Sequence, residues 1–474
     1  MDYNQQAAFY HVASSNHAEL AQPQMEAIRA YLPAARQDAV NLLKAFNRSC
    51  EPGQTSALTF PSHLSPYGFP GSLGGSPNGD LRMRWEGIWA LSAHMWDWEY
   101  TRNVTTLREL SWPLATGLAE MWRCWLVKVE SPGSPDGYLL VDKDDSWGEQ
   151  NLGQLPNLIN PNQPIAWLTR LFTFLPVMAS VLDEPIPDWW EEILVHLPPQ
   201  PISAPNAIGG GQILGMASNQ LSIDDCLTAV WPAEVADVLG EVPDRLSLIS
   251  ANNTLLSQGF AVSPNVSPRY NDPYMDYHAT RGTHVWMAAS RIAAAHPREH
   301  ATSCKLRSWE PEEMGDLVEC LHVWLNYTMM PSEITTFRTL PFAAQGGTLE
   351  DASVAQAVND MLLTSHGHGL RLFPIWAALR PMQNASFKTL RAKGAFLVSA
   401  EYDGVSQLVA NVRIFSEKGQ LCRILSPWAK NVTIMVVSTG SQPTRHTTLH
   451  KAGPRGWFEF PTEAGVTYSV SVVR

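Results

Sequence analysis

The feature that most constrains the fold is a change of hydrophobic pattern near residue 370 of the 474-residue chain. Before this point, apolar residues recur every three or four positions, as on one face of a helix. After it, short segments alternate apolar and polar residues between Asp-Gly, Lys-Gly and Thr-Gly turns, as antiparallel strands do. The succession of the two patterns predicts a helical part followed by a β part.

The helical part combines regular periodicity with long loops rich in Pro, Gly and Asn. Loops of this length in a compact domain are usually functional or unstructured. Helices joined alternately by short turns and long loops predict a toroid of helical hairpins, with the long loops gathered at one end. Helices are expected at 26–46, 86–101, 107–129, 165–182, 283–296, 313–330 and 350–366.

The C-terminal part predicts an antiparallel β-sandwich of about a hundred residues. We therefore expect two domains, 1–370 and 371–474. The predicted strands lie within 394–404, 407–419, 420–427, 431–440, 456–465 and 467–474.

Composition excludes several classes of function. The formal charge of −12 argues against a nucleic-acid partner, because phosphate binding needs clustered Lys and Arg. No window reaches the length and apolarity expected of a membrane span. No metal-ligand set, phosphate loop or dinucleotide motif is visible, so no cofactor is expected. The 18 Trp fit mainly a core role, and an excess of Trp is also typical of sites that stack sugar faces.

The cysteines and the glycosylation sequons give conflicting signals about the compartment. The six cysteines show no CxxC spacing, and buried free thiols are the expectation. Seven Asn-x-Ser/Thr sequons exceed chance, yet "MDYNQQAAFYHVASS" lacks the basic and apolar regions of a signal peptide. Two interpretations stay open: a cytosolic protein with unused sequons, or a protein whose signal lies upstream of this sequence.

The segment around the change of pattern resembles a known family. "NDMLLTSHGHGLRLFPIW" with "FKTLRAKGAFLVSAEYDG" is similar to the end of the catalytic domain in glycoside hydrolase family 95. "SEKGQLCRILSPW" and "WALSAHMWDWEYTRNVTTLRELSWPL" resemble further segments of family-95-like proteins, so that the resemblance covers about residues 1–435. It implies an (α/α)6 barrel followed by a β domain, without the family's N-terminal β-sandwich.

The resemblance also implies an activity, the inverting exo-hydrolysis of α-L-fucosides or α-L-galactosides. In that family a Glu acts as general acid, while an Asn pair and an Asp manage the attacking water. "DGYLLVDKDDSWGEQN" places Glu149 at the acid's position. A glycosidase acid needs a raised pKa, which the neighbouring Asp144 and Asp145 would supply by like-charge repulsion. The alternative is a solvated acidic loop.

The residues that would handle the water match the family less closely. "MDYNQQAAFY" places Asn4 at one Asn of the family's pair and Asp2 at the other, where an Asp would itself act as base. A residue beside the start of the chain is alternatively only frayed. The activating Asp aligns with Gln345 from one direction and with Glu350 from the other, where Leu-Glu-Asp runs to Asp351. We expect Glu350, whose alternative role is to stabilise a helix N-terminus.

Several aromatic and imidazole side chains are candidates for contacts with a sugar, each with core packing as its alternative role. They are Trp89, Trp147, His94, His278, His284 and His366.

Three functions from different classes are compatible with the sequence. The first is an inverting glycosidase acting on a small-molecule or glycan substrate. The second is a repurposed barrel that catalyses a lyase, cyclase or isomerase reaction on a small apolar substrate, since function is grafted onto folds. The third is a catalytically inactive glycan-binding protein.

Overall fold

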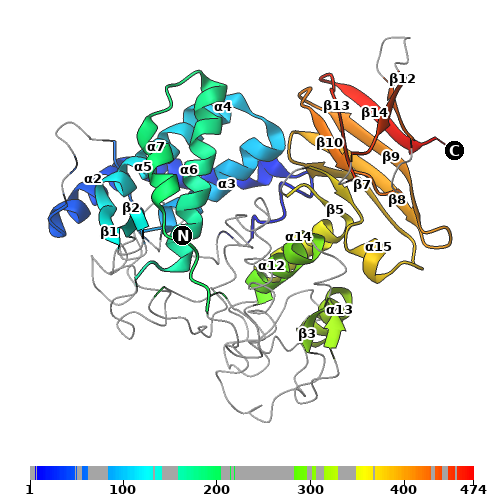
Figure 1. Cartoon of the computed structure of the whole chain (residues 1–474), viewed down its shortest axis with the longest axis horizontal. Coiled ribbons are helices and arrows are strands. Elements are labelled where there is room, and N and C mark those ends of the chain that lie inside the picture. The colour runs from blue at the N-terminus through cyan, green and yellow to red at the C-terminus, as the bar shows by residue number, and fades with distance from the viewer. Residues whose placement is uncertain are drawn as a thin grey trace.

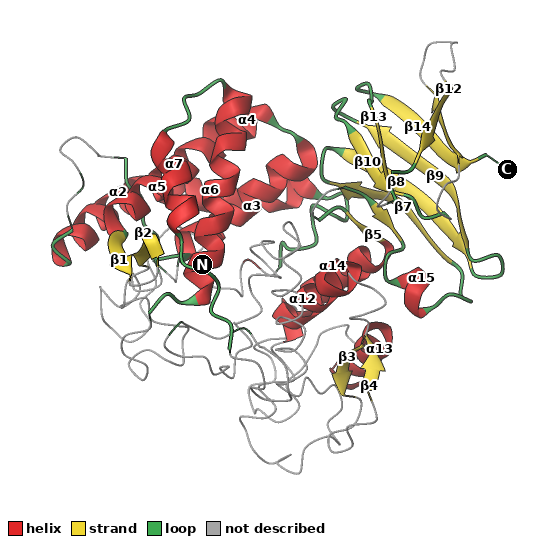
Figure 2. Cartoon of the chain, viewed as in Figure 1, coloured by secondary structure: helices red, strands yellow, loops and turns green. Residues whose placement is uncertain are grey.

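The structure is a computed structural model with a helical part and a β part that lie side by side (Figures 1 and 2). It describes residues 6, 8–48, 50, 56–61, 64, 84–131, 134–140, 159–203, 214, 218, 282–295, 302–305, 314–328, 349–366, 369–428, 433–439, 447–453 and 456–473.

Each of the seven predicted helical segments contains a helix. The helices are η1 (Ala18–Ala21), α2 (Gln22–Ala45), α3 (Glu86–Thr101), α4 (Val104–Thr106), the π-helix η3 (Leu107–Ser111), α5 (Trp112–Trp125), α6 (Asn162–Leu182), α7 (Asp188–His196), α12 (Gly282–Ala295), α13 (Leu317–Thr328), α14 (Leu349–Leu362) and α15 (Trp376–Leu379). The closed (α/α)6 barrel is not shown by the described residues and stays a prediction.

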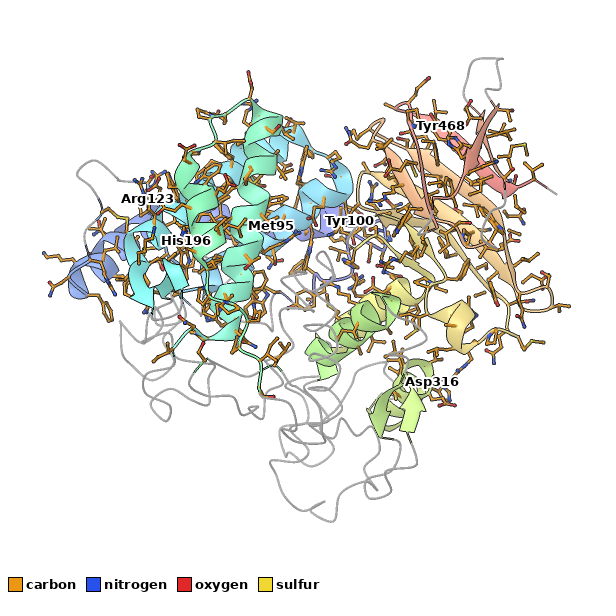
Figure 3. The ribbon with its side chains drawn as sticks, in the orientation of Figure 1. Met95, Tyr100, Arg123, His196, Asp316 and Tyr468 are labelled. Atoms are coloured by element: carbon orange, nitrogen blue, oxygen red, sulfur yellow. A yellow bond between two sulfur atoms is a disulfide. The ribbon has the colours of Figure 1, made fainter. Side chains whose placement is uncertain are left out.

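Helices α3 and α5 form a hairpin with local signals at its turn. Arg102 ends α3 in the left-handed conformation, and Asn103 caps α4 by accepting hydrogen bonds from two backbone N–H groups. Gly87 permits the close approach of α5, because a Cβ there would lie 2.5 Å from Leu118 Cδ2. The hairpin buries one continuous aromatic and aliphatic core with α2, α6 and α7, to which Met95 and Tyr100 belong (Figure 3).

The helix α6 corrects one sequence expectation. It is long and apolar enough, by length and composition, to cross a membrane, whereas no such window was expected. In the structure 67% of its apolar window is buried, and Trp167, Leu171 and Phe172 pack into the helical core. Burial on most of its circumference accounts for its apolarity.

The cysteine expectation was partly wrong. Cys50 and Cys124 form a disulfide that joins the segment after α2 to the last turn of α5. Cys320 is also disulfide-bonded, whereas Cys422 is a buried free thiol as expected. Spacing in the sequence gave no sign of the Cys50–Cys124 pair, because 74 residues separate them and the fold alone brings their Cα atoms to 5.0 Å.

The β part confirms the predicted antiparallel strands. Its strands are β7 (Ala385–Ala392), β8 (Phe396–Asp403), β9 (Leu408–Ser416), β10 (Cys422–Leu425), β11 (Thr433–Thr439), β12 (Thr447–Lys451), β13 (Trp457–Phe460) and β14 (Val466–Val472). Six of them form a sheet in the order β12-β11-β14-β9-β8-β7, and β10 pairs with β13. Both sheets contribute to one hydrophobic core. The sequence reading missed β7, β12 and the helix α7.

Four further short strands lie outside the β part, and two of them replace predicted helix ends. They are β1 (Val127–Ser131), β2 (Ser134–Leu140), β3 (Thr302–Lys305) and β4 (Met314–Asp316). The helix predicted to 129 ends at Trp125 and continues as β1, and the helix predicted from 313 is preceded by β4.

The junction between the two parts is a tightly bonded segment. α14 runs into β5 (Leu363–Thr364), which pairs with β6 (Arg371–Leu372), and the predicted boundary at residue 370 falls between these strands. Leu370 bridges to Ile424 of β10. Arg391 of β7 binds Glu417, donates to Asn16 Oδ1 at 3.0 Å and ties the sheet to the N-terminal segment.

Three helices end at this junction. The backbone N–H of Gly394 donates to the carbonyl oxygen of Glu99 in the last turn of α3, at 2.7 Å. Arg371 donates to the carbonyl oxygen of Ala294 in the last turn of α12, at 2.9 Å. α12 and α14 pack along each other, and both reach the junction with their C-terminal ends (Figure 1). The starts of α3, α12 and α14 therefore lie away from the sheet, and we call this side the starting end.

Candidate functional site

The starting end begins with a stack of indoles. Trp85, at the N-cap of α3, stacks on Trp89 with ring centroids 5.7 Å apart, and Trp89 stacks on Trp167 of α6 at 6.4 Å. Because Trp89 and Trp167 belong to the first two turns of their helices, α6 also starts at this end. All three indoles are at most 2% exposed, so the role that the structure shows for them is packing.

Polar side chains are buried beside these helix starts. Asn162 and Gln163 open α6 and are fully buried. Gln163 Oε1 has no hydrogen-bond partner among the described residues. Buried amides without partners are uncommon, because each unmade hydrogen bond costs about 1–3 kcal/mol. Groups of this kind at the starts of helices suit a site that binds a polar ligand.

The strand that leads toward Glu149 also leaves from the starting end. The guanidinium of Arg84 lies 3.8 Å from the ring centroid of Trp125, which places the end of α5 beside the start of α3. β1 follows α5 directly, and Leu140 at the end of β2 pairs with Val127 at the beginning of β1. The Gly-Tyr-Leu-Leu segment expected before the general acid is thus a strand, and it ends nine residues before Glu149.

Three predicted residues lie on helices that start at this end. His284 belongs to the first turn of α12, and Glu350 and Asp351 belong to the first turn of α14. Their side chains lie outside what the structure describes. Seven other predicted residues lie outside the described residues altogether: Asp2, Asn4, Asp145, Trp147, Glu149, His278 and Gln345.

Two predicted histidines are buried in the described part. His94 is 1% exposed within α3, and neither ring nitrogen has a hydrogen-bond partner. Burial lowers the pKa of His94 to about 3, so the ring is neutral. His366 follows β5, and its Nε2 lies 3.3 Å from Asp360 Oδ1. The contact of either ring with a sugar stays a prediction, and the contact that the structure shows for His366 is with Asp360.

Asp360 is the centre of a buried polar network between α12 and α14. Its carboxylate accepts hydrogen bonds from Gln356 Nε2 at 2.9 Å and Ser290 Oγ at 3.1 Å, and Arg291 Nε lies 4.0 Å away. Ser14 donates to Gln356 Oε1 at 2.7 Å, which extends the network to the N-terminal segment. With Asp360 only 1% exposed, these partners are what makes the buried carboxylate tolerable.

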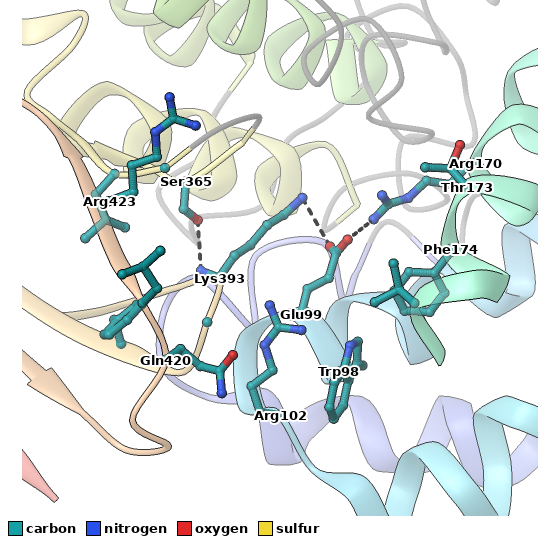
Figure 4. Close-up of a pocket in the computed structure, with 16 residues that line it drawn as sticks. Trp98, Glu99, Arg102, Arg170, Thr173, Phe174, Ser365, Lys393, Gln420 and Arg423 are labelled. Atoms are coloured by element: carbon teal, nitrogen blue, oxygen red, sulfur yellow. Dashed lines mark hydrogen bonds and ion pairs between the residues drawn. The ribbon is translucent and has the colours of Figure 1, made fainter. Parts of the chain in front are cut away.

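A second charged cluster lines a pocket at the junction (Figure 4). Glu99 forms ion pairs with Arg170 of α6 and with Lys393, whose Nζ lies 3.1 Å from Glu99 Oε2. The pocket has a volume of about 380 Å³. Its other lining residues are Trp98, Arg102, Thr173, Phe174, Val177, Ser365, Gly369, Leu370, Gly394, Phe396, Gln420, Leu421 and Arg423.

The junction pocket is distant from Glu350. Ser365 of the pocket follows the C-terminal end of α14, whereas Glu350 lies in its first turn. A helix of this length spans about 20 Å, so one small ligand cannot contact both. The three ionised side chains are at most 13% exposed and connect α3, α6 and the segment after β7. Through Glu99, these ion pairs hold the segment after β7 against α3 and α6, and we call the three residues the clamp.

The sequence reading missed this cluster and the Asp360 network. A signal was present for Arg170, because it is the single charged residue of a long apolar helical segment. A charged side chain within a buried helix predicts an oppositely charged partner. Only the fold shows that Arg170 pairs with Glu99 and that Glu99 also pairs with Lys393. Among the described residues, no group of three or more His, Cys, Asp or Glu suits a metal ion.

Comparisons with known proteins identify no close relative. No protein-family model matches the chain, and no curated protein matches it in sequence. One solved structure, described as a proposed kojibiose phosphorylase from the human microbiome, aligns with 98% of this chain at 8% identity and a TM-score of 0.42. The chain spans 60% of the length of that protein. Similarity this low establishes neither a shared fold nor a shared activity.

Proposed function

We propose that the protein is a carbohydrate-active enzyme whose site lies at the starting end of α3, α6, α12 and α14. The observation that supports this most strongly is that the elements leading to two predicted carboxylates both lie on the side of the helical part away from the sheet. The strand before Glu149 leaves there, and the first turn of α14, with Glu350, begins there. These are the two carboxylates that the sequence resemblance assigns to acid and base.

The finer proposal is an inverting exo-glycosidase acting on α-L-fucosides or α-L-galactosides. Glu149 donates a proton to the leaving-group oxygen, and Glu350 removes a proton from the attacking water, which Asn4 and Asp2 orient. Inverting enzymes keep their two carboxyl groups about 6.5–9.5 Å apart, so that a water fits between the base and the sugar. Polar amides at the start of α6 fit a site for a small sugar.

The test is hydrolysis of a panel of aryl and natural α-L-fucosides and α-L-galactosides by the wild type, Glu149→Gln and Glu350→Gln. We expect turnover with inversion of the anomeric centre, as determined by NMR of the released sugar. Loss of acid or base catalysis lowers kcat by about 10²–10⁴-fold. The acid variant alone should regain rate on a substrate with a dinitrophenolate leaving group, because that group departs without protonation.

Three outcomes contradict the proposal. They are retention of configuration, full activity of both variants, and no turnover of any substrate by folded wild-type protein. The last result would favour non-hydrolytic chemistry or glycan binding at the same helix starts.

A further inference from the structure

We propose that the protein carries N-linked glycans on Asn47, Asn103 and Asn384 and acquires its disulfides in the same oxidising compartment. This inference does not depend on the proposed enzymatic activity. It rests on the sequons, on the environment of the three asparagines and on the Cys50–Cys124 bond.

The number of sequons exceeds what composition gives. The chain has 21 Asn and 64 Ser or Thr among 474 residues, so independent placement would produce about three sequons, whereas seven are present. Three of them have an Asn side chain that the structure describes, namely Asn47, Asn103 and Asn384. All three asparagines are exposed, and each lies next to the end of a helix or strand. These are the surface positions at which a bulky glycan fits.

The hydrogen bonds of Asn103 leave its reactive atom unused. Its Oδ1 accepts from the backbone N–H groups of Thr105 at 3.1 Å and Thr106 at 3.2 Å. Its Nδ2, the atom to which an N-linked sugar is attached, donates no hydrogen bond to a described residue. A glycan on Nδ2 therefore leaves the helix cap intact, because the cap uses only the oxygen.

Asn384 shows the same arrangement before β7. Its Oδ1 accepts from the backbone N–H of Gly404 at 2.8 Å, and its Nδ2 donates to no described residue. Asn411, which is exposed but not in a sequon, differs in this respect, because its Nδ2 donates to Glu401 Oε2 at 2.6 Å. Asn47 lies in a left-handed turn directly after α2, three residues before Cys50.

The disulfides point to the same compartment as the sequons. Cys50–Cys124 closes a long loop, and Cys320 is disulfide-bonded as well. Structural disulfides form and persist in secretory and extracellular environments and are rare in the reducing cytosol.

In the glycosylation step, Asn Nδ2 bonds to sugar C1 of a lipid-diphosphate-linked oligosaccharide. The C1–O bond to the diphosphate breaks, the lipid diphosphate leaves, and Nδ2 loses one proton to the transferase's base.

The experiment is peptide mapping of the protein purified from the cells that produce it. Removal of N-glycans by an amidase in isotopically heavy water converts each glycosylated Asn to labelled Asp. We expect labelled Asp at the three positions and none at Asn41, which is exposed and accepts from Gln37 Nε2 but has no sequon. A digest without reductant should contain the Cys50–Cys124 cross-linked peptide.

A pair of variants separates the glycan from the helix cap. Thr105→Ala removes the sequon but keeps the backbone N–H that Asn103 binds, so we expect loss of one glycan on a gel and a retained cap. Asn103→Ala removes both the glycan and the cap, and should lower the midpoint of thermal unfolding further than Thr105→Ala does. Unmodified peptides at all three positions, or Cys50 and Cys124 recovered as free thiols, would overturn the proposal.

Discussion

The two ends of the helical part are stabilised by different chemistry. At the junction with the sheet, ionised side chains are buried and paired, as in Glu99 with Arg170 and Lys393. At the starting end the described contacts include stacked indoles and the guanidinium of Arg84 over the Trp125 ring, and the Cys50–Cys124 disulfide fixes the end of α5. Buried ion pairs fix one relative orientation, because a displaced partner leaves an uncompensated charge. Stacked rings tolerate small displacements without such a cost.

This difference suggests that the junction serves mainly stability and that the starting end serves the proposed chemistry. The junction holds the sheet against the helices, and none of its described residues is one that the sequence resemblance assigns to catalysis. The starting end carries Trp89, His284, Glu350 and Asp351 and the strand that precedes Glu149 in the chain.

The largest effect on stability is expected from Cys124→Ser at the starting end. A disulfide with a sequence separation of 74 stabilises by about 4 kcal/mol in the chain-entropy description. Urea unfolding of the variant under oxidising conditions should show a loss of this size. Wild-type protein treated with reductant is the control and should show a loss at least as large, because Cys320 is also disulfide-bonded. A loss below about 1 kcal/mol would mean that the pair does not form.

Glu99→Gln tests the clamp at the junction. Removing one partner of a buried ion pair costs about 3–5 kcal/mol, here because the buried charges of Arg170 and Lys393 lose the carboxylate that both contact. Glu192→Gln is the matched control, since the Glu192–Lys128 pair is about half exposed and should contribute less than 1 kcal/mol. Equal losses in the two variants would show that the Glu99 cluster is not a clamp.

Asp97 makes the junction side of α3 sensitive to pH. Burial raises the pKa of Asp97 from 3.8 to about 6, although the charge of Arg391 opposes the change. The folded state therefore binds more protons than the unfolded state between about pH 4 and 6, so this contribution to stability decreases as pH rises through that range. This rise in the pKa of Asp97 corresponds to a loss of roughly 3 kcal/mol at most in the free energy of unfolding.

Asp97→Asn should remove this dependence. The buried amide keeps part of the desolvation cost, so we expect a net gain of about 1–2 kcal/mol at pH 8 and little change at pH 4. Thermal unfolding at the two pH values measures it. A variant that is less stable than the wild type at pH 8 would contradict the assignment.

The fold was predictable from the sequence where local pattern decides structure. The helix at 86–101 was predicted to the residue, and the strands of the β part followed from alternation and turn residues. Contacts between distant segments were not predictable. Cys50 and Cys124, or Glu99 and Lys393, meet only after the helices pack, and a one-dimensional pattern carries no information about such pairs. The membrane-length apolarity of α6 was present in the sequence and was missed, and only the fold shows that 67% of this apolar window is buried.

The candidate site was predicted from a different kind of evidence than the fold was. Glu149 and Glu350 came from a family resemblance and not from periodicity. The structure adds where β2, which precedes Glu149 in the chain, ends and on which side α14, which carries Glu350, begins.

The measurement that tests the account most directly compares Glu350→Gln with Glu99→Gln on the best substrate of the panel. Both kcat/KM and the free energy of unfolding would be measured for each. We expect Glu350→Gln to keep wild-type stability and lose at least about 100-fold in kcat/KM. Glu99→Gln should lose stability and keep activity per folded molecule. The reverse pattern, with catalysis lost at Glu99 and retained at Glu350, would contradict the account and place the chemistry at the junction.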